Sequence, residues 1–309
     1  MLSIIKSISL QGLQGYLVSA QVDVSAGLPN FEIVGLPDIT VKESKERIKT
    51  AIKNSGLEFL SRKIVVNLSP ANIKKEGSMF DLPIAIGVLI ATENIINPNL
   101  QEYLENTVII GELSLNGNVE KINGILPMCM EAKKLGIKRI ILPKANATEA
   151  YIIKGLDILP VGNLTELVDF FNGNSIIEKE ENIDFNSKFI SQYEFDFSEV
   201  KGQENVKRAL EIAAAGGHNC LLIGSPGSGK TMLARRLPSI LPDISFEESL
   251  EVTKIHSICG LLSEENPIIC TRPFRSPHHT ITDVSLIGGG RNPKPRRNKF
   301  GSSWRSIFR

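Results

Sequence analysis

The sequence predicts an α/β protein with two domains, and three observations support this fold class. Apolar strand-like runs alternate with helical patterns along most of the chain. A glycine-rich loop lies between a strand-like run and a helix-like run. A stretch rich in Asn, Ser, Glu and Lys at 173–196 indicates a linker. The 309 residues are therefore expected to form a first domain at 1–172, this linker, and a second domain at 197–295.

The first domain shows both the strand and the helix periodicity. Apolar and β-branched runs predict strands at 17–24, 31–34, 63–68, 108–114 and 139–143. Helical spacing predicts helices at 41–52, 82–91 and 127–136. Asp38 or Thr40 is expected to cap the first helix, and Asn116-Gly117 predicts a tight hairpin. This alternation indicates a mixed α+β domain.

The glycine-rich loop carries the P-loop pattern G-x-x-x-x-G-K-[ST]. It follows the apolar run 220–223, which is predicted to be a strand, and precedes a helix-like run at 232–237. Its residues are Gly224, Ser225, Pro226, Gly227, Ser228, Gly229, Lys230 and Thr231. Because both flanks match, an ordinary Gly/Ser/Pro turn is disfavoured.

The chemistry of this loop predicts ATP and Mg²⁺ as ligands. Glycines let the backbone approach the phosphates, and the N–H groups of 227–231 are expected to face the anion. Lys230 is expected to reach the β- and γ-phosphates, and the Thr231 hydroxyl to bind Mg²⁺.

Composition excludes several other classes of protein. The net charge of +1 gives no global basic field toward nucleic acid or membranes, although a local basic face stays open. The four cysteines have no C-x-x-C spacing and are expected to be reduced, as in a cytoplasmic protein. No signal peptide and no apolar run near the ~18 residues of a membrane helix are found. A metal site formed by His256, His278 and His279 is disfavoured, because the spacing matches no ligand pattern.

The second domain resembles an AAA+ ATPase module. The segment 200–203 and the helix-like run 204–215 are similar to the element that precedes the P-loop in that family. The stretches 272–280 and 288–293 resemble its magnesium-chelatase-like branch, most closely the ComM/YifB (competence protein) type, and 27–37 matches the same type. The resemblance implies an ATP-driven motor that assembles with itself into a ring, a hexamer in full-length relatives. It also implies DNA as a partner, with a role in branch migration during natural transformation.

The first domain resembles the Lon protease domain, which has the ribosomal S5 domain 2-like fold. Residues 111–119 and 136–143 carry this likeness. In that family a Ser–Lys dyad performs acyl transfer, in which the lysine deprotonates the serine. Here Met79 occupies the serine position and Leu126 the lysine position, while Ser78 lies one position away. The expected role is a protease-inactive scaffold or interaction domain.

The segment after the P-loop departs from the family pattern. The acidic strand that completes the Mg²⁺ site, the helical lid and its arginine are not found after residue 231. Codons can be chosen for residues 296–309 that, when read one base later, encode EEISLAHRGEVFL. This shifted sequence is close to the segment that relatives carry at this point. We interpret 296–309 as a frameshifted tail, so a basic nucleic-acid arm is disfavoured. Weak nucleotide binding and negligible hydrolysis are expected of this chain.

Two other classes of function stay open at this stage. One is a chelatase-type motor that remodels a protein or a metal-insertion partner. The other is a non-enzymatic interaction module formed by the first domain alone. His278 and His279 are assigned either to a loop that faces the ring pore or DNA, or to buried loop packing.

Overall fold

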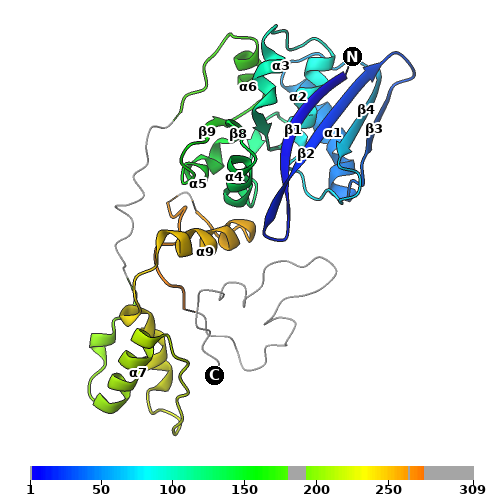
Figure 1. The fold of residues 1–309 in the computed structure, drawn as a ribbon. Helices are drawn as coiled ribbons and strands as arrows, with labels where there is room; N and C mark the ends of the chain where they lie inside the picture. The colour runs from blue at the N-terminus through cyan, green and yellow to red at the C-terminus, as the bar shows by residue number, and fades with distance from the viewer. Residues whose placement is uncertain (1, 180–192, 264, 275–309) are drawn as a thin grey trace. The chain divides into compact units, whose positions relative to one another are not determined.

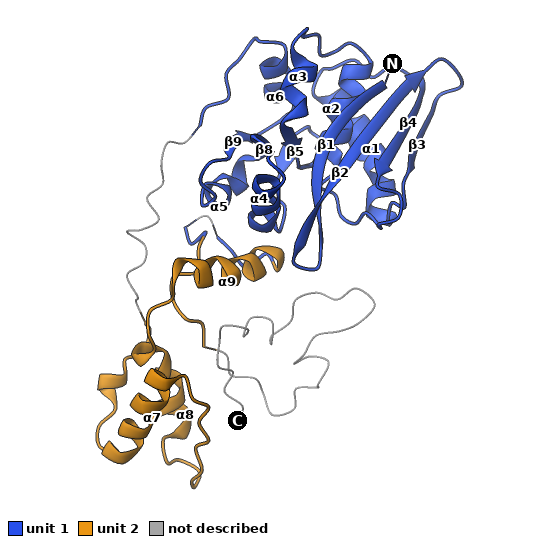
Figure 2. Ribbon diagram, viewed as in Figure 1, with its two compact units in different colours: residues 1–183, 260–267 blue, residues 184–259, 268–309 orange. Residues whose placement is uncertain are grey.

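The computed structural model describes residues 2–179, 193–263 and 265–274, and it confirms the mixed α/β fold class. The chain forms two compact units, residues 1–183 with 260–267 and residues 184–259 with 268–309 (Figure 2). The domain boundaries at 172, 196 and 295 stay a prediction. Within the residues that the structure describes, no helix is both long and apolar enough to cross a lipid bilayer.

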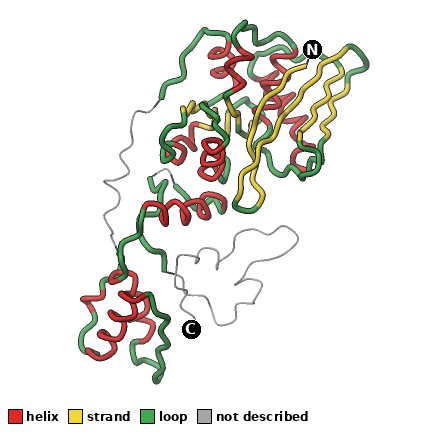
Figure 3. Tube along the Cα trace, in the orientation of Figure 1, coloured by secondary structure: helices red, strands yellow, loops and turns green. Residues whose placement is uncertain are grey.

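The first unit is built on a twisted sheet of seven strands (Figures 1 and 3). The strands are β1 (Leu2–Gln11), β2 (Gln14–Ser25), β3 (Asn30–Val34), β4 (Lys63–Ser69), β5 (Thr107–Ile109), β8 (Arg139–Pro143) and β9 (Asp157–Val161). Their order is β3-β4-β2-β1-β5-β8-β9. β1 and β4 each pair antiparallel with β2, and the other neighbours are parallel. A separate pair, β6 (Glu112–Leu113) and β7 (Val119–Glu120), forms the predicted Asn116-Gly117 hairpin.

Helices connect and cover these strands. They are α1 (Ile39–Asn54), α2 (Asp81–Ala91), α3 (Leu100–Glu105), α4 (Ile125–Lys134), the 3-10 turn η1 (Lys144–Asn146), α5 (Ala147–Ala150) and α6 (Leu164–Phe171). The predicted cap of α1 is confirmed, because the Asp38 carboxylate accepts a hydrogen bond from the Val41 amide at 2.8 Å.

The helix α2 is the centre of the hydrophobic core of the first unit. All but one of its eleven residues are buried, which confirms the predicted buried helix. Gly87 lies against β2, where an added Cβ would be 2.6 Å from the Val22 side chain. This close approach also lets the Ser3 hydroxyl donate a hydrogen bond to the Gly87 carbonyl at 2.7 Å.

The predicted strand at 108–114 is wrong as a single element. The structure divides it into β5 and β6, with Gly111 between them. The Gly111 amide donates to the Met79 carbonyl, and the Leu82 amide donates to the Gly111 carbonyl, each at 3.0 Å. The chain therefore leaves the sheet in order to bond the start of α2.

β1 and β9 are strands that the sequence reasoning missed. In β1, buried serines interrupt the apolar pattern.

The second unit is helical in the part that the structure describes. Its elements are η3 (Phe197–Glu199), α7 (Glu204–Gly216), α8 (Lys230–Arg236), η4 (Leu237–Ile240) and α9 (Phe246–Ile258). A small core joins Phe197, Val200, Leu210, Ala214, Leu233 and Leu237. The strand predicted at 220–223 is wrong in this structure, because Leu221 and Ile223 are 83% and 87% exposed and no strand pairs with them. A strand is stable only beside a partner, and the described residues of this unit contain no strand.

Candidate nucleotide-binding site

The loop 224–231 is an exposed turn that leads directly into a helix. Gly227 and Gly229 adopt left-handed backbone angles, with φ of 81° and 86°. Gly229 lies just before the first residue of α8, and its carbonyl accepts the first intrahelical hydrogen bond, from the Leu233 amide at 3.0 Å. The sequence needs glycine here because other residues reach this conformation only at a cost.

Lys230 occupies the centre of this loop. Its ammonium group donates hydrogen bonds to the carbonyls of Gly224 at 2.9 Å and Ser225 at 2.8 Å, and to the Ser228 hydroxyl at 3.3 Å. The loop therefore wraps around one positive charge. Because the loop is exposed and its oxygens are neutral, the ammonium remains able to exchange these contacts for phosphate oxygens.

Gln203 is a site residue that the sequence reasoning did not assign. It lies directly before α7 with a left-handed φ of 57°, and its Nε2 donates to the Ser228 carbonyl at 3.1 Å. The signal available in the sequence was the pair Gly202-Gln203 ahead of a helix. That pair marks a special turn but does not show which loop the side chain contacts.

The P-loop helix is fixed to the segment at 195–200 by polar and apolar contacts. The Arg236 guanidinium bonds the Glu199 carboxylate, with nitrogen–oxygen distances of 2.5 and 3.0 Å, and lies 5.1 Å from the Phe195 ring centroid. The Phe197 amide donates to the Ser239 hydroxyl at 2.9 Å. Leu233 is buried in the small core of this unit. These contacts hold the helix that begins at Lys230.

The remaining predicted residues of the second unit are distributed differently. Thr231 follows Lys230 in the first turn of α8. His256 is buried on α9. His278, His279 and 296–309 lie outside the described residues. Within the part of the chain that is described, no group of three or more His, Cys, Asp or Glu side chains could hold a metal ion.

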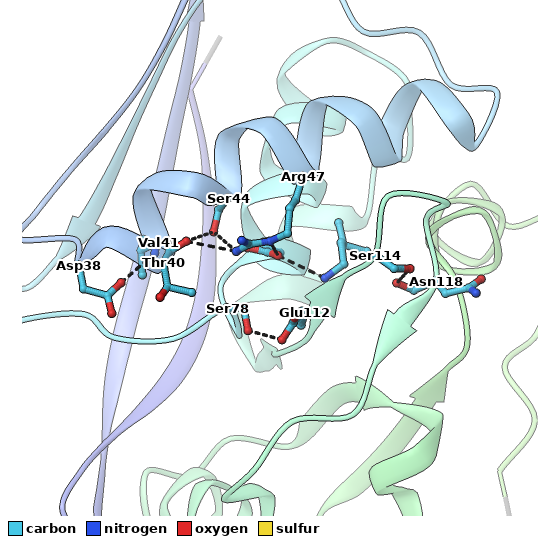
Figure 4. A network of polar contacts seen from close by, with 11 residues as sticks. Asp38, Thr40, Val41, Ser44, Arg47, Ser78, Glu112, Ser114 and Asn118 are labelled. Carbon is cyan, nitrogen blue, oxygen red and sulfur yellow. Dashed lines mark hydrogen bonds and ion pairs between the residues drawn. The ribbon is translucent and has the colours of Figure 1, made fainter.

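The positions expected for a Ser–Lys dyad carry no such pair. Leu126 is completely buried in the core, and Met79 packs against the core of the first unit. The Ser78 hydroxyl donates to the Glu112 carboxylate, as Figure 4 shows. Lys75, the lysine just upstream, is completely buried and donates to the carbonyls of Pro70 and Ile73. Burial lowers the pKa of this ammonium from its ordinary value.

A buried ion pair lies beside this region. The Arg47 guanidinium of α1 contacts the fully buried Asp81 carboxylate at the start of α2 through two hydrogen bonds, at 2.7 and 3.1 Å. Arg47 also donates to the Ser44 hydroxyl and the Thr40 carbonyl (Figure 4). Burial raises the pKa of the Asp81 carboxyl, and the hydrogen bond from Arg47 opposes that increase. The Leu113 amide of β6 also donates to the Asp81 carboxylate at 3.3 Å, so the network joins α1 to α2 and β6 and has a structural role.

Comparison with known proteins identifies two family models along the chain. Residues 20–146 match "Subunit ChlI of Mg-chelatase", and residues 196–298 match "Magnesium chelatase, subunit ChlI". The second match contains the whole loop 224–231.

Curated relatives indicate the same family. YifB of Escherichia coli is 42% identical over 294 residues, which are 95% of this chain and 56% of YifB. The competence protein ComM of Haemophilus influenzae is 38% identical over 301 residues, which are 95% of this chain and 57% of ComM. Lon protease 2 of Bacillus subtilis is 31% identical over 131 residues, 41% of this chain and 22% of that protease. This last match supports the Lon-like fold predicted for the first domain.

The chain thus spans little more than half the length of YifB and ComM. The identity extends across both units, and two magnesium-chelatase models match in the expected order. The chain belongs to the magnesium-chelatase-like AAA+ family that includes YifB and ComM.

Proposed function

We propose that this chain binds ATP with Mg²⁺ through residues 224–231, as the nucleotide-binding part of an AAA+ motor. The observation that carries the proposal is the loop that surrounds the Lys230 ammonium with three oxygen atoms at 2.8 to 3.3 Å. A lysine held inside a glycine-rich loop at the start of a helix is the arrangement that binds β- and γ-phosphates. The magnesium-chelatase model that matches 196–298 supports this assignment.

Each residue of the loop has a separate task in this proposal. Gly227 and Gly229 shape the backbone so that amide groups of 227–231 are available to phosphate oxygens. Lys230 turns from its carbonyl contacts to the phosphates, and Thr231 supplies a hydroxyl ligand to Mg²⁺. When it is bound, Mg²⁺ neutralises phosphate charge. Negligible ATP hydrolysis stays a prediction made from the sequence.

The wider role that we propose is DNA processing by a self-assembled ring. It is supported by the 38% identity to ComM, whose name describes a competence protein. In full-length proteins of this kind, ATP binding would power the action of the ring on DNA. A cytoplasmic location is part of the same proposal.

The direct test is a titration of the purified chain with a fluorescent ATP analogue and Mg²⁺. Lys230→Ala removes a charge-assisted contact worth about 1.5–3 kcal/mol, so we expect roughly 10- to 100-fold weaker binding. Lys254→Ala, which changes a lysine of α9 paired with Glu251, is the matched control and should bind as the wild type does. Equal affinity of the Lys230→Ala variant and the wild type would refute the proposal.

A further inference from the structure

The exposed side of α1 carries a line of four lysines, Lys42, Lys45, Lys49 and Lys53. Because an α-helix turns once every 3.6 residues, the four positions lie within about 80° of one another around the helix axis. All four side chains are exposed. We refer to this line as the lysine stripe, and it is about 16 Å long at 1.5 Å per residue.

The stripe is held by a rigid scaffold. The other side of α1 is buried, with Val41, Ile48, Ala51 and Ile52 completely excluded from solvent. Asp38 fixes the first turn, and the ion pair of Arg47 with Asp81 fixes the flank that faces α2. The lysines can therefore move their side chains, while their backbone positions stay constant.

The stripe has an excess of positive charge, with four lysines and one neighbouring glutamate, Glu46, on the helix. Among the described residues, no ion pair joins any of the four lysines to a carboxylate. Glu46 is the single carboxylate beside the stripe on the helix, since Glu43 lies farther around the axis toward Arg47. Like charges three or four positions apart on a helix repel one another. A ligand with a line of negative charges would relieve that repulsion.

Two further basic residues lie at the end of the sheet that α1 approaches. β3, α1 and β4 form a crossover between parallel strands (Figure 1). The helix α1 therefore ends near the end of the sheet at which β4 begins. Arg62 and Lys63, both exposed, lie at that beginning. The end of the stripe at Lys53 and these two residues thus belong to the same end of the crossover.

We propose that the lysine stripe of α1 contacts the phosphate backbone of DNA, which places a DNA-binding surface on the first unit, outside the P-loop domain. The proposal rests on the DNA-processing role proposed above. Successive lysines along the stripe are about 4.5–6 Å apart along the axis, which suits a row of phosphates and exceeds the size of a single small anion. Phosphate contacts of this kind position nucleic acid without reading its sequence.

A membrane surface is the less favoured partner for this stripe. Helices that bind membranes insert an apolar face between lipid headgroups. The apolar face of α1 is already packed in the core, so only the charged side is available. Vesicles that contain anionic lipid serve as a probe for this alternative.

The test compares two variants that each lose four positive charges. In the stripe variant, Lys42, Lys45, Lys49 and Lys53 are all changed to Gln, which preserves helix propensity. In the control variant, exposed lysines elsewhere in the first unit are changed to Gln, namely Lys134, Lys138, Lys144 and Lys154. Binding of labelled DNA oligonucleotides to the full chain is followed by fluorescence anisotropy over a range of salt concentrations.

The expected result is a specific change in the salt dependence. Each lost phosphate contact reduces the slope of log affinity against log salt by about 0.7–0.9, so the stripe variant should lose about three units of slope. Its affinity at low salt should fall at least about tenfold, while the control variant stays close to the wild type. Glu46→Gln removes the carboxylate beside the stripe on α1 and should tighten binding. Equal effects of the two lysine variants, binding to anionic vesicles but not to DNA, or no DNA binding by the wild type would overturn the inference.

The same preparations separate this inference from the proposed function. ATP-analogue binding is measured on the wild type and the stripe variant in parallel. If both proteins bind ATP and the stripe variant binds DNA as the wild type does, the inference is refuted and the nucleotide proposal is unaffected. DNA binding that depends on the stripe, in a chain that does not bind ATP, supports the inference and refutes the nucleotide proposal.

Discussion

The side-chain amide of Gln203 donates a hydrogen bond to the Ser228 carbonyl at 3.1 Å, and thereby joins the start of α7 to the loop before α8. Gln203 makes this contact from a left-handed backbone conformation, with φ of 57°. For a residue other than glycine that conformation costs roughly 1–2 kcal/mol. Strain of this kind persists where the surroundings fix it, and it is common at functional sites.

The first prediction concerns this contact. Gln203→Ala removes the hydrogen bond to Ser228, so the loop is less ordered before ATP binds. A neutral hydrogen bond contributes about 1 kcal/mol, so the affinity for an ATP analogue should fall about fivefold. Gln203→Gly also removes the bond but relieves the backbone strain. If the glycine variant binds ATP as tightly as the wild type, the side-chain contact has no role in ordering the loop.

The second prediction separates loop shape from general stability. Gly229→Ala places a Cβ at a φ of 86°, and Gly173→Ala does the same at 78° in the first unit. At Gly173 an added Cβ meets no atom within 4 Å, so only the backbone conformation is strained there. Each substitution should cost roughly 1–2 kcal/mol of stability. Only Gly229→Ala should weaken ATP-analogue binding, measured beside urea unfolding of both variants.

The sequence predicted those features that depend on near neighbours in the chain. Asp38 caps α1, α2 is buried along its length, and the Asn116-Gly117 turn closes a hairpin. Each of these follows from a residue type and its spacing. The P-loop glycines were likewise identified from their pattern, and the structure gives two of them the left-handed angles that the pattern requires.

The features that the sequence did not predict depend on distant partners. The strand expected at 108–114 breaks because Gly111 bonds Met79 and Leu82, about thirty residues earlier. The hydrogen bond from Gln203 to Ser228 joins the turn before α7 to the loop before α8. The sequence pattern predicts α7 as a helix but does not show how it is oriented relative to that loop. The apolar run 220–223 satisfies every local rule for a strand, but a strand also needs a neighbour, and Leu221 and Ile223 stay exposed.

The third prediction is that the first unit has no peptidase activity. Leu126 occupies a fully buried apolar position, and the Lys75 ammonium donates hydrogen bonds to the backbone carbonyls of Pro70 and Ile73. Neither residue can serve as a base for the Ser78 hydroxyl, which is bonded to Glu112. Incubation of the purified chain with casein should give no cleavage products, and Ser78→Ala should change nothing. Cleavage that Ser78→Ala abolishes would contradict this prediction.

The fourth prediction concerns the buried pair of Arg47 and Asp81. Arg47→Leu leaves the Asp81 carboxylate without its main partner in a fully buried position. Removal of one member of a buried ion pair costs about 3–5 kcal/mol, so the urea midpoint of the first unit should fall strongly at neutral pH. Asp81→Asn combined with Arg47→Leu removes both charges and should recover part of that loss. A double variant no more stable than Arg47→Leu would argue against an unpaired charge as the cause.

The pH dependence of the Arg47→Leu variant follows from the same carboxyl. Burial raises the pKa of Asp81, and Arg47 opposes the increase, so the substitution should raise this pKa further. A raised pKa in the folded state means that protonation favours folding. That contribution is complete below the unfolded pKa and is lost as the pH rises through the folded pKa.

The stability difference between Arg47→Leu and the wild type should therefore be smaller at about pH 5 than at neutral pH. Urea unfolding at both values, followed by circular dichroism, measures this difference. An equal loss of stability at the two values would show that lost packing around Arg47, and not the unpaired Asp81 carboxylate, destabilises the variant.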